Sequence, residues 1–289
     1  MAAIQMTGPV YTPPASEIVR TVPVEAPDVS VVMAVRNGER FIADAISSVL
    51  GQTFRNFELV VIDDGSSDQT QEILKQFQDA RMRVSAHSPL GLAKALNSGV
   101  RTARANLIAR MDADDVSQPA RLERQVTFMR EHPETGLLGT ATNVIDENGV
   151  GLRSWAPFTE DHDIRSALIK SNQFAHSSVM LRKQVFEQVG GYADMPFAQD
   201  YDLWLRIAAI TRVANLSEPL VLRRERCGRA DAARDSAQAK WAMKARWNAL
   251  RRGGYSPLSV RHLVKPGIGA ITPAPVRELA RVLVDRSAA

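Results

Sequence analysis

The sequence has a single cysteine and no apolar run long enough to cross a membrane. Cys227 is alone among 289 residues, so an intramolecular disulfide is excluded and the cytoplasm is the simplest expected location. No stretch reaches the roughly 20 apolar residues that a membrane-spanning helix needs. Residues 1–27 lack the apolar core of a signal peptide and contain five prolines. We therefore expect a flexible tail over 1–27, and any membrane contact would be peripheral.

A strong net charge is also missing. Lys and Arg exceed Asp and Glu by 36 to 32, a surplus too small to indicate a nucleic-acid partner. The surplus is concentrated in residues 228–289, where two explanations stay open: a solvated basic helix face, or contact with anionic lipid headgroups or an anionic acceptor. The basic residues there include Arg246, Arg251, Arg252, Arg261, Lys265, Arg277, Arg281 and Arg286.

Between Asp28 and Asp115, short β-branched runs alternate with stretches of helical periodicity. This alternation is typical of a parallel sheet covered by helices. Because ligands of such sheets gather at the carboxyl ends of the strands, Asn37, Asp63, Asp64 and residues 112–115 are expected along one rim. Strands are predicted at Val29–Ala34, Glu58–Ile62, Arg83–Ser85 and Leu107–Met111, and helices at Glu39–Leu50, Asp68–Gln76 and Gly91–Ala103.

The pattern after Asp115 is less regular. Trp204 lies at helical spacing from Ile207 and is predicted to be a core residue. A final helix is expected within Arg261–Arg286. The other predictions are a helix at Gln118–Glu131, a strand at Gly136–Ile145, a turn at Asp146–Gly151, loop and helix over Trp155–Ser171, a strand at His176–Leu181, a turn at Glu187–Tyr192, and helices at Asp200–Ala209 and Asp231–Arg252.

The segment LIARMDADD, Leu107–Asp115, runs from an apolar strand into three carboxylates. Neighbouring carboxylates repel one another, and burial beside a strand adds a desolvation cost. A bound divalent cation removes both costs, and oxygen ligands suit Mg²⁺ or Mn²⁺ shared with substrate phosphates. The alternative is structural, since Asp115 or Ser117 before Pro119 also fits a helix start.

Two nucleotide-binding motifs are absent. No Gly-x-Gly-x-x-Gly follows the first strand, and no Gly-x-x-x-x-Gly-Lys-Ser/Thr occurs. A dinucleotide-binding Rossmann domain and a P-loop enzyme are therefore disfavoured. A nucleotide in this protein would be held by carboxylates and backbone groups.

Four separated segments together resemble a known family. They are VSVVMAVRNGERFIADAISSVLGQTFRNFELVVIDDGSSD, GLAKALNSGV, ARMDADDVSQPARLE and AQDYDLWLRIA. In this order and spacing they resemble the inverting nucleotide-sugar glycosyltransferases of family 2, which have the GT-A fold. The resemblance covers roughly Asp28 to Leu222. It implies an α/β fold with a Rossmann-like, mixed but mainly parallel sheet flanked by helices, followed here by a helical C-terminal extension.

The resemblance implies roles for individual residues. The rim after the first strand, together with Asp64, matches the site of the nucleotide base and ribose. Asp112 and Asp114 match the metal and diphosphate motif, with Asp114 the better candidate for a direct ligand of Mn²⁺ or Mg²⁺. Asp200 matches the general base that deprotonates the acceptor hydroxyl. His176 and Gln199 match the acceptor side. The rim residues are Ala34, Arg36, Asn37 and Glu39.

Structural explanations stand beside these roles. Asp63 and Asp64 with Gly65 fit a turn before a helix, and Asp200 fits a helix cap. His176 is as often a structural residue as a ligand. Lys94 and Arg121 suit exposed helix positions, with a phosphate contact as the alternative.

Two features depart from the family pattern. The run VLRRERCGRAD, after Leu220, lacks the histidine with which many members approach the metal, so Arg223, Arg224 or Arg226 is expected to neutralise phosphate instead. The Gln-x-x-Arg-Trp motif of processive synthases is also absent. Transfer of one sugar at a time is therefore expected.

These observations predict three segments and one activity. Residues 1–27 form the tail, 28–222 the GT-A domain (nucleotide half 28–115, acceptor half 116–222), and 223–289 a basic, mostly helical region. The expected activity is metal-dependent, inverting transfer of a sugar to a surface-glycan or lipid-linked acceptor, and the expected donor is a UDP-sugar. The expected location is the cytoplasm, with peripheral contact to the inner face of the membrane through residues 223–289. The alternatives are a non-catalytic binding subunit and a nucleotidyltransferase.

Overall fold

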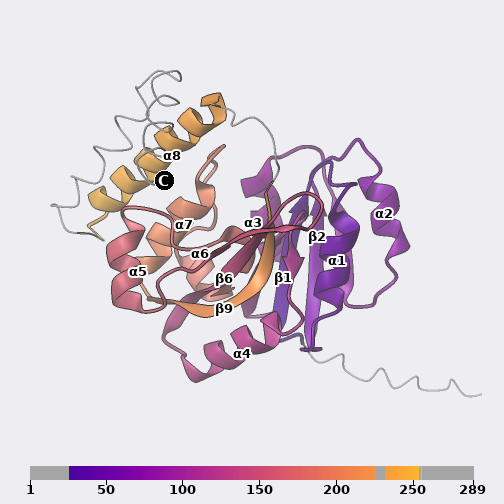
Figure 1. The fold of residues 1–289 in the computed structure, drawn as a ribbon, viewed down its shortest axis with the longest axis horizontal. Helices are drawn as coiled ribbons and strands as arrows, with labels where there is room; N and C mark the ends of the chain where they lie inside the picture. The colour runs from indigo at the N-terminus through magenta and orange to yellow at the C-terminus, as the bar shows by residue number, and fades with distance from the viewer. Residues whose placement is uncertain (1–25, 226–231, 254, 256–289) are drawn as a thin grey trace, which may run out of the picture.

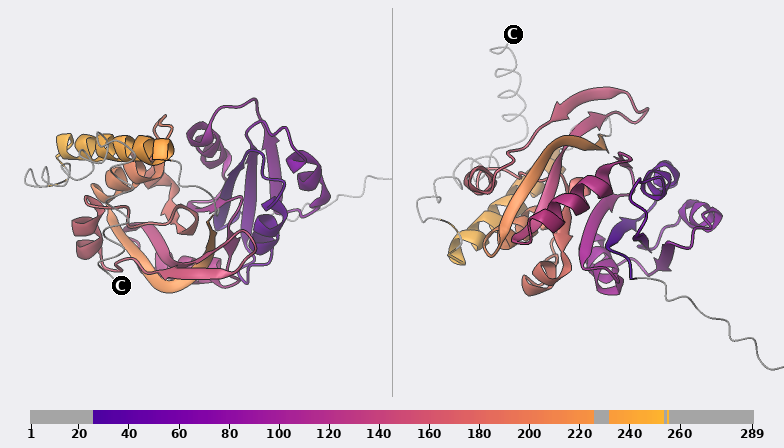
Figure 2. Two further views of the ribbon diagram at one scale, coloured as in Figure 1. Left: turned by 45° about the horizontal axis from the view of Figure 1, so that its top comes forward. Right: turned by 90° about the horizontal axis from the view of Figure 1, so that it is seen from below.

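The computed structural model describes residues 26–225, 232–253 and 255. Within these residues, one curved sheet lies between helices on both of its faces (Figures 1 and 2). None of the helices described is long and apolar enough to span a bilayer. Cys227, Arg226, the final predicted helix and nearly all of the predicted tail lie outside the described residues.

The first half of the fold follows the alternating pattern of the sequence. Its four strands confirm the prediction within one or two residues at each end. The helices do so as well, except that the first begins at Ile42, after a turn in which Phe41 N–H donates to Gly38 O at 3.0 Å. The elements are β1 (Val29–Val35), α1 (Ile42–Leu50), β2 (Phe57–Asp63), α2 (Thr70–Gln76), β3 (Met82–Ala86), α3 (Leu92–Thr102) and β4 (Leu107–Asp112).

The second half adds shorter strands and more helices. Its elements are β5 (Val116–Ser117), α4 (Arg121–Glu131), β6 (Thr135–Ile145), β7 (Gly151–Trp155), α5 (Asp161–Leu168), the 3₁₀ turn η1 (His176–Ser178), β8 (Met180–Arg182), α6 (Lys183–Gln188), α7 (Gln199–Ala208), β9 (Arg212–Arg224) and α8 (Ala232–Arg251).

The sheet is mixed but mainly parallel, as predicted. Its strand order is β3-β2-β1-β4-β8-β6-β9-β5, and β7 pairs with β6 beside this path. Strands β8, β5 and β7 are antiparallel to their neighbours, and the other pairings are parallel. Because β1 and β4 are adjacent and parallel, Ala34 pairs in register with Asp112. The carboxyl ends of these two strands therefore form one rim.

Two apolar cores hold the helices against the sheet. Alternate side chains of β1 point to opposite faces, so Val31 belongs to the core under α1, α2 and α4. Its neighbour Val32 belongs to the core under α3, α5, α7 and α8. Trp204 is fully buried in this second core, which confirms its prediction.

The predictions for the second half were wrong in several places. The predicted strand His176–Leu181 is a 3₁₀ turn followed by only three strand residues. No strand was expected at β5, β7 or β9, and no helix at α6. The long strand β9 contains Pro219, and its register with β6 shifts between Leu216 and Pro219, so its apolar alternation is broken at Ser217–Glu218.

Candidate active site

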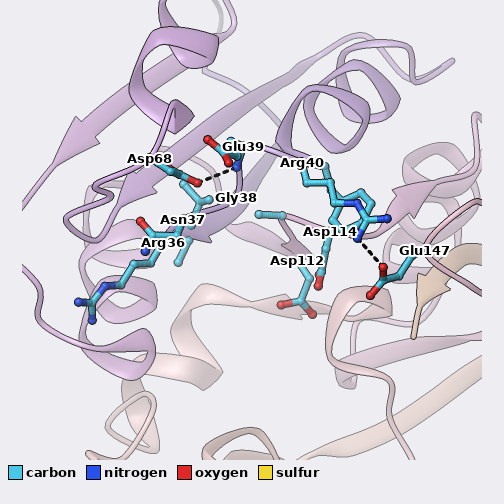
Figure 3. A pocket seen from close by; sticks show the side chains of 13 residues that line it. Arg36, Asn37, Gly38, Glu39, Arg40, Asp68, Asp112, Asp114 and Glu147 are labelled. Carbon is cyan, nitrogen blue, oxygen red and sulfur yellow. Dashed lines mark hydrogen bonds and ion pairs between the residues drawn. The ribbon is translucent and has the colours of Figure 1, made fainter. Parts of the chain in front are cut away.

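A cleft of about 470 Å³ opens at the carboxyl ends of β1 and β4. Six predicted site residues line it: Ala34, Arg36, Asn37, Glu39, Asp112 and Asp114. Figure 3 shows the two aspartates beside Arg40 and Glu147, while Asn37, Glu39 and Asp68 lie on the other side. Asp64, His176, Gln199 and Asp200 do not line this cleft.

The β1–α1 loop is locked to the loop before α2. Asn37 has a left-handed φ of 53°, and its Oδ1 accepts a 2.8 Å hydrogen bond from Ser67 N–H. Glu39 Oε2 accepts from Gln69 N–H at 2.9 Å, and Glu39 N–H donates to Asp68 at 3.1 Å. These bonds fix the cleft wall, so Asn37 and Glu39 shape it even without a ligand.

Asp64 holds the start of α3. Its two carboxylate oxygens accept from Leu90 N–H at 2.6 Å and from Gly91 N–H at 2.9 Å, and only 4% of the residue is exposed. Its neighbour Asp63 accepts from Ser66 N–H at 3.0 Å and from Gln71 Nε2 at 2.7 Å. Both carboxylates therefore have a structural function in this fold.

Asp112 is held by a buried arginine that the sequence analysis did not single out. Arg110 is 2% exposed, and its Nη2 lies 2.6 Å from Asp112 Oδ1. Ser177 Oγ donates to Asp112 Oδ2 at 2.5 Å. Burial raises the pKa of Asp112, but the charge of Arg110 and these bonds outweigh it and lower the pKa to about 2. Asp112 is therefore ionised and already has two partners.

Asp115 has the opposite electrostatic environment. It is 3% exposed, its Oδ2 contacts Ser177 Oγ, and its Oδ1 accepts from Arg224 N–H at 2.7 Å. Burial, followed by the negative charge of Asp112, raises the pKa of Asp115 to about 7. The three carboxylates of the motif are thus not equivalent: Asp115 lies behind the cleft wall as a structural group.

Arg224 fills the region where the expected histidine is missing. Its Nε donates to Asp114 O at 2.9 Å, and its Nη1 donates to Asp146 O and Glu147 O at 3.2 and 3.1 Å. Its guanidinium also stacks over the Phe41 ring at 4.3 Å. The side chain is only 6% exposed. Arg224 therefore braces the aspartate loop, and the phosphate contact expected of Arg223, Arg224 or Arg226 stays a prediction.

Asp114 is the half-buried carboxylate that lines the cleft. Among the described residues, no three His, Cys, Asp or Glu side chains form a cage for a metal ion. Mg²⁺ and Mn²⁺ do not require one, because they bind through one or two carboxylates together with water and substrate phosphates. Asp112 and Asp114 both line the cleft, so the donor set fits a cation that these carboxylates would share with a phosphorylated ligand.

Asp200 lies in the first turn of α7, and it does not cap that helix. The N-cap is Ala198, with a left-handed φ of 56° and no side-chain capping bond. Asn172 Nδ2 donates to Asp200 Oδ2 at 2.9 Å. Burial raises the pKa of Asp200, and the nearby charge of Asp112 raises it further. Its neighbour Gln199 is 9% exposed. Asp200 is therefore not the N-cap of α7, although a hydrogen bond with the backbone of Tyr201 in the same turn lowers its pKa and so partly offsets this rise.

His176 belongs to an aromatic cluster. Its Nε2 lies 2.9 Å from the Tyr192 hydroxyl, and its ring centroid lies 6.1 Å from that of Trp204. Burial and the charge of Arg110 lower the pKa of His176 to about 3, so the ring is neutral near pH 7. This environment supports the structural explanation. Arg121 is likewise 1% exposed and bonds to Arg110 O at 2.8 Å, so its exposed placement was wrong.

Comparison with known proteins gives one consistent family. The profile of "Glycosyl transferase family 2" matches residues 30–190. The O-antigen biosynthesis glycosyltransferase WbnJ of Escherichia coli is 36% identical over 201 residues, which are 67% of this chain and 78% of the relative. Five relatives are 30–36% identical to this chain, and the matches cover 64–78% of the length of these relatives. The first of them is covered over 66% of its length, which is just under two thirds.

Two solved structures share the fold. S. aureus TarS 1–349 in complex with UDP-GlcNAc superimposes with a TM-score of 0.62 at 18% identity, over 75% of this chain and 66% of that one. The mannosyltransferase PcManGT of Pyrobaculum calidifontis, in complex with GDP-Man and Mn²⁺, superimposes with a TM-score of 0.62 at 17% identity, over 91% and 81%.

Proposed function

Because this chain belongs to glycosyltransferase family 2, we propose that it transfers one sugar at a time from a nucleotide-diphosphate donor to an acceptor hydroxyl, with inversion at the sugar. The observation that carries this proposal is the cleft between Ala34 and Asp112, the paired ends of two parallel strands. Ligands of open α/β sheets bind at such an edge, and this one presents the carboxylates of Asp112 and Asp114.

The two sides of the cleft suit two parts of the donor. The locked loop of Asn37 and Glu39 would face the nucleoside, while Asp112 and Asp114 would face the diphosphate. Arg36 extends away from the two aspartates (Figure 3) and would meet the donor from the outer side. Both oxygens of Asp64 accept hydrogen bonds from backbone N–H groups. Asp64 would therefore contact the nucleotide base of the donor through its remaining lone pairs, or would position the loop at Leu90 that faces this base.

A divalent cation, Mn²⁺ or Mg²⁺, fits the site at Asp114. When bound there, it would supply positive charge to stabilise the leaving diphosphate. Arg110 keeps Asp112 ionised and in place, and Arg224 holds the backbone of Asp114. The residues of the chain therefore fix the orientation of the carboxylates that meet the diphosphate.

Asp200 would be the general base. As the acceptor oxygen forms its bond to the anomeric carbon, the bond from that carbon to the β-phosphate oxygen breaks and the hydroxyl proton passes to the carboxylate. The single displacement inverts the anomeric centre. The environment supports this role: Asn172 orients Asp200, and its raised pKa makes it a better proton acceptor than an exposed aspartate.

The acceptor is inferred from relatives. WbnJ carries the name of an O-antigen biosynthesis enzyme, so we assign a surface-glycan or lipid-linked acceptor to this chain as well. The donor base is left to experiment, with a UDP-sugar as first candidate. We also propose a cytoplasmic location with peripheral membrane contact, which such an acceptor supports and with which a single cysteine is compatible.

A donor panel tests the proposal. The purified full-length chain is mixed with UDP-, dTDP- and GDP-sugars and with Mn²⁺ or Mg²⁺, with and without EDTA. Thermal shift reports binding, and release of the nucleoside diphosphate reports donor turnover. Stabilisation by one donor that EDTA abolishes is the expected result. The proposal is wrong if no nucleotide sugar changes the melting temperature or is turned over.

A further inference from the structure

The outward face of α8 carries three basic side chains and a tryptophan in one row. Lys240, Lys244, Trp247 and Arg251 are all exposed, and Trp247 is exposed to 49%. At about 100° per residue, these four positions fall within an arc of roughly 60°. We call them the α8 stripe.

The opposite face of α8 fixes the direction of the stripe. Ala245 and Ala249 are buried against the core, and Arg246 donates to the Tyr201 hydroxyl at 2.9 Å and to Lys170 O at 2.6 Å. The helix is thus anchored through one side on α7, at the far end of the molecule from α2 (Figure 1). The α8 stripe therefore lies on the face of the helix opposite this anchor, with Lys244 at its edge beside residues 189–195.

The charge of the stripe is not neutralised locally. Between Ser236 and Arg252 the sequence has five basic residues and no acidic residue. Within the described part of the chain, Lys240, Lys244 and Arg251 form no ion pair with a carboxylate, whereas Arg252 approaches Asp202 at 3.9 Å. Residues 228–289 contain twelve Lys and Arg against four Asp and Glu, so the remainder of the chain is net acidic. The positive charge of the chain is therefore concentrated in the segment of the sequence that contains α8.

A basic row centred on a half-exposed tryptophan suits one partner in particular. Anionic lipid headgroups attract Lys and Arg near a membrane surface, and the amphipathic indole ring prefers the interface between headgroups and acyl chains. We propose that the α8 stripe docks the protein on an anionic lipid surface, with Trp247 inserted among the headgroups. Only the purpose of this docking rests on the proposed function: docking would bring the cleft to a lipid-linked acceptor.

Vesicle binding tests this without any donor. Full-length protein is sedimented with vesicles of phosphatidylcholine containing 30% phosphatidylglycerol, and with vesicles of pure phosphatidylcholine, at low and high salt. The test variant is Lys240→Gln/Lys244→Gln/Arg251→Gln. The matched control is Lys75→Gln/Arg55→Gln/Arg101→Gln, which removes three exposed charges from the other half of the protein. Donor-induced thermal shift and donor turnover are measured for both variants and should equal those of the wild type.

We expect binding to the anionic vesicles alone, lost at high salt. Each basic residue near such a surface contributes roughly a factor of five, so the stripe variant should bind about a hundredfold more weakly while the control binds like the wild type. Trp247→Ala should also weaken binding to the anionic vesicles at low salt. The proposal fails if the wild type binds both vesicles equally, if the stripe variant retains wild-type binding, or if a short DNA duplex competes fully with the vesicles. If vesicle binding fails while donor turnover is intact, the docking proposal is wrong and the proposed function stands. If donor turnover fails while vesicle binding is intact, the docking proposal stands and the proposed function is wrong.

Discussion

Nη2 of Arg110 lies 2.6 Å from Oδ1 of Asp112, two residues further along the same strand, and the arginine is almost fully buried. Residues i and i+2 of a strand point to the same face, so β4 itself brings the two charges together. The charge of Asp112, the first carboxylate of the cleft, is thus balanced by an arginine of the same strand.

Arg110→Met should destabilise the protein and weaken donor binding. Removing one partner of a fully buried pair costs about 3 to 5 kcal/mol, and Asp112 is partly exposed, so we expect about 2 kcal/mol of lost unfolding free energy. Urea denaturation measures this cost. Arg124→Met, on the exposed side of α4, is the matched control and should change the unfolding free energy little. Equal stability of Arg110→Met and the wild type would contradict the ion pair.

Asp200→Asn should abolish transfer and preserve donor binding. An amide cannot accept the acceptor proton, and loss of a general base costs about 10²- to 10⁴-fold in rate. Steady-state kinetics of transfer and donor-induced thermal shift separate the two effects. Asp194→Asn, which removes a largely exposed carboxylate, should keep full activity. Transfer at the wild-type rate by Asp200→Asn would rule out Asp200 as base.

Asp114→Ala should remove the metal dependence of donor binding. The cleft would lose the carboxylate that faces the diphosphate, so kcat/KM should fall by at least about a hundredfold. The measurement is donor-induced thermal shift across a Mn²⁺ titration, with Glu72→Ala on exposed α2 as control. An unchanged Mn²⁺ dependence in Asp114→Ala would leave the cation without its assigned ligand.

Asp115→Asn should become relatively more stable as pH rises. The folded protein holds the pKa of Asp115 near 7, above its ordinary value of 3.8, so the folded state binds that proton more tightly than the unfolded state. The wild type therefore loses stability between about pH 4 and pH 7 through this group, and the asparagine variant does not. The difference between the urea midpoints of the wild type and of Asp115→Asn should therefore shrink or change sign from pH 5 to pH 8. A difference between the two proteins that is constant with pH would contradict the raised pKa.

Arg224→Ala should loosen the aspartate loop. Three hydrogen bonds to backbone carbonyls and the stacking on Phe41 are lost together, which we expect to cost about 2 to 4 kcal/mol. Donor KM should rise more than kcat falls, because the loop would no longer be held in its binding geometry. Arg212→Ala, exposed on the same strand, serves as control, and a similar loss in both variants would count against a specific brace.

The sequence predicts the first half of the fold well because its strands are continuous apolar runs that end in polar residues. The same regularity places Asn37, Asp112 and Asp114 on one rim. The strand β9 escapes prediction because Pro219 and the irregular register at Ser217–Glu218 interrupt its alternation.

The partners of the carboxylates are the part that sequence spacing cannot supply. Ser177 reaches Asp112 across 65 positions, and Leu90 N–H meets Asp64 across 26. One signal was available for Arg110: a single charged residue inside an apolar strand predicts a buried counter-ion. Asp112, two positions later, is that counter-ion.

The hydrogen bond from Arg224 N–H to Asp115 joins positions 109 residues apart, which has a consequence for synthesis of the chain. A nascent polypeptide that has emerged from the ribosome only as far as Asp115 already contains all three carboxylates of the motif. It cannot brace them until Arg224 has also emerged. Donor affinity should therefore arise late in translation, and ribosome-bound chains that end before Arg224 should bind the nucleotide sugar more weakly than chains that extend past it.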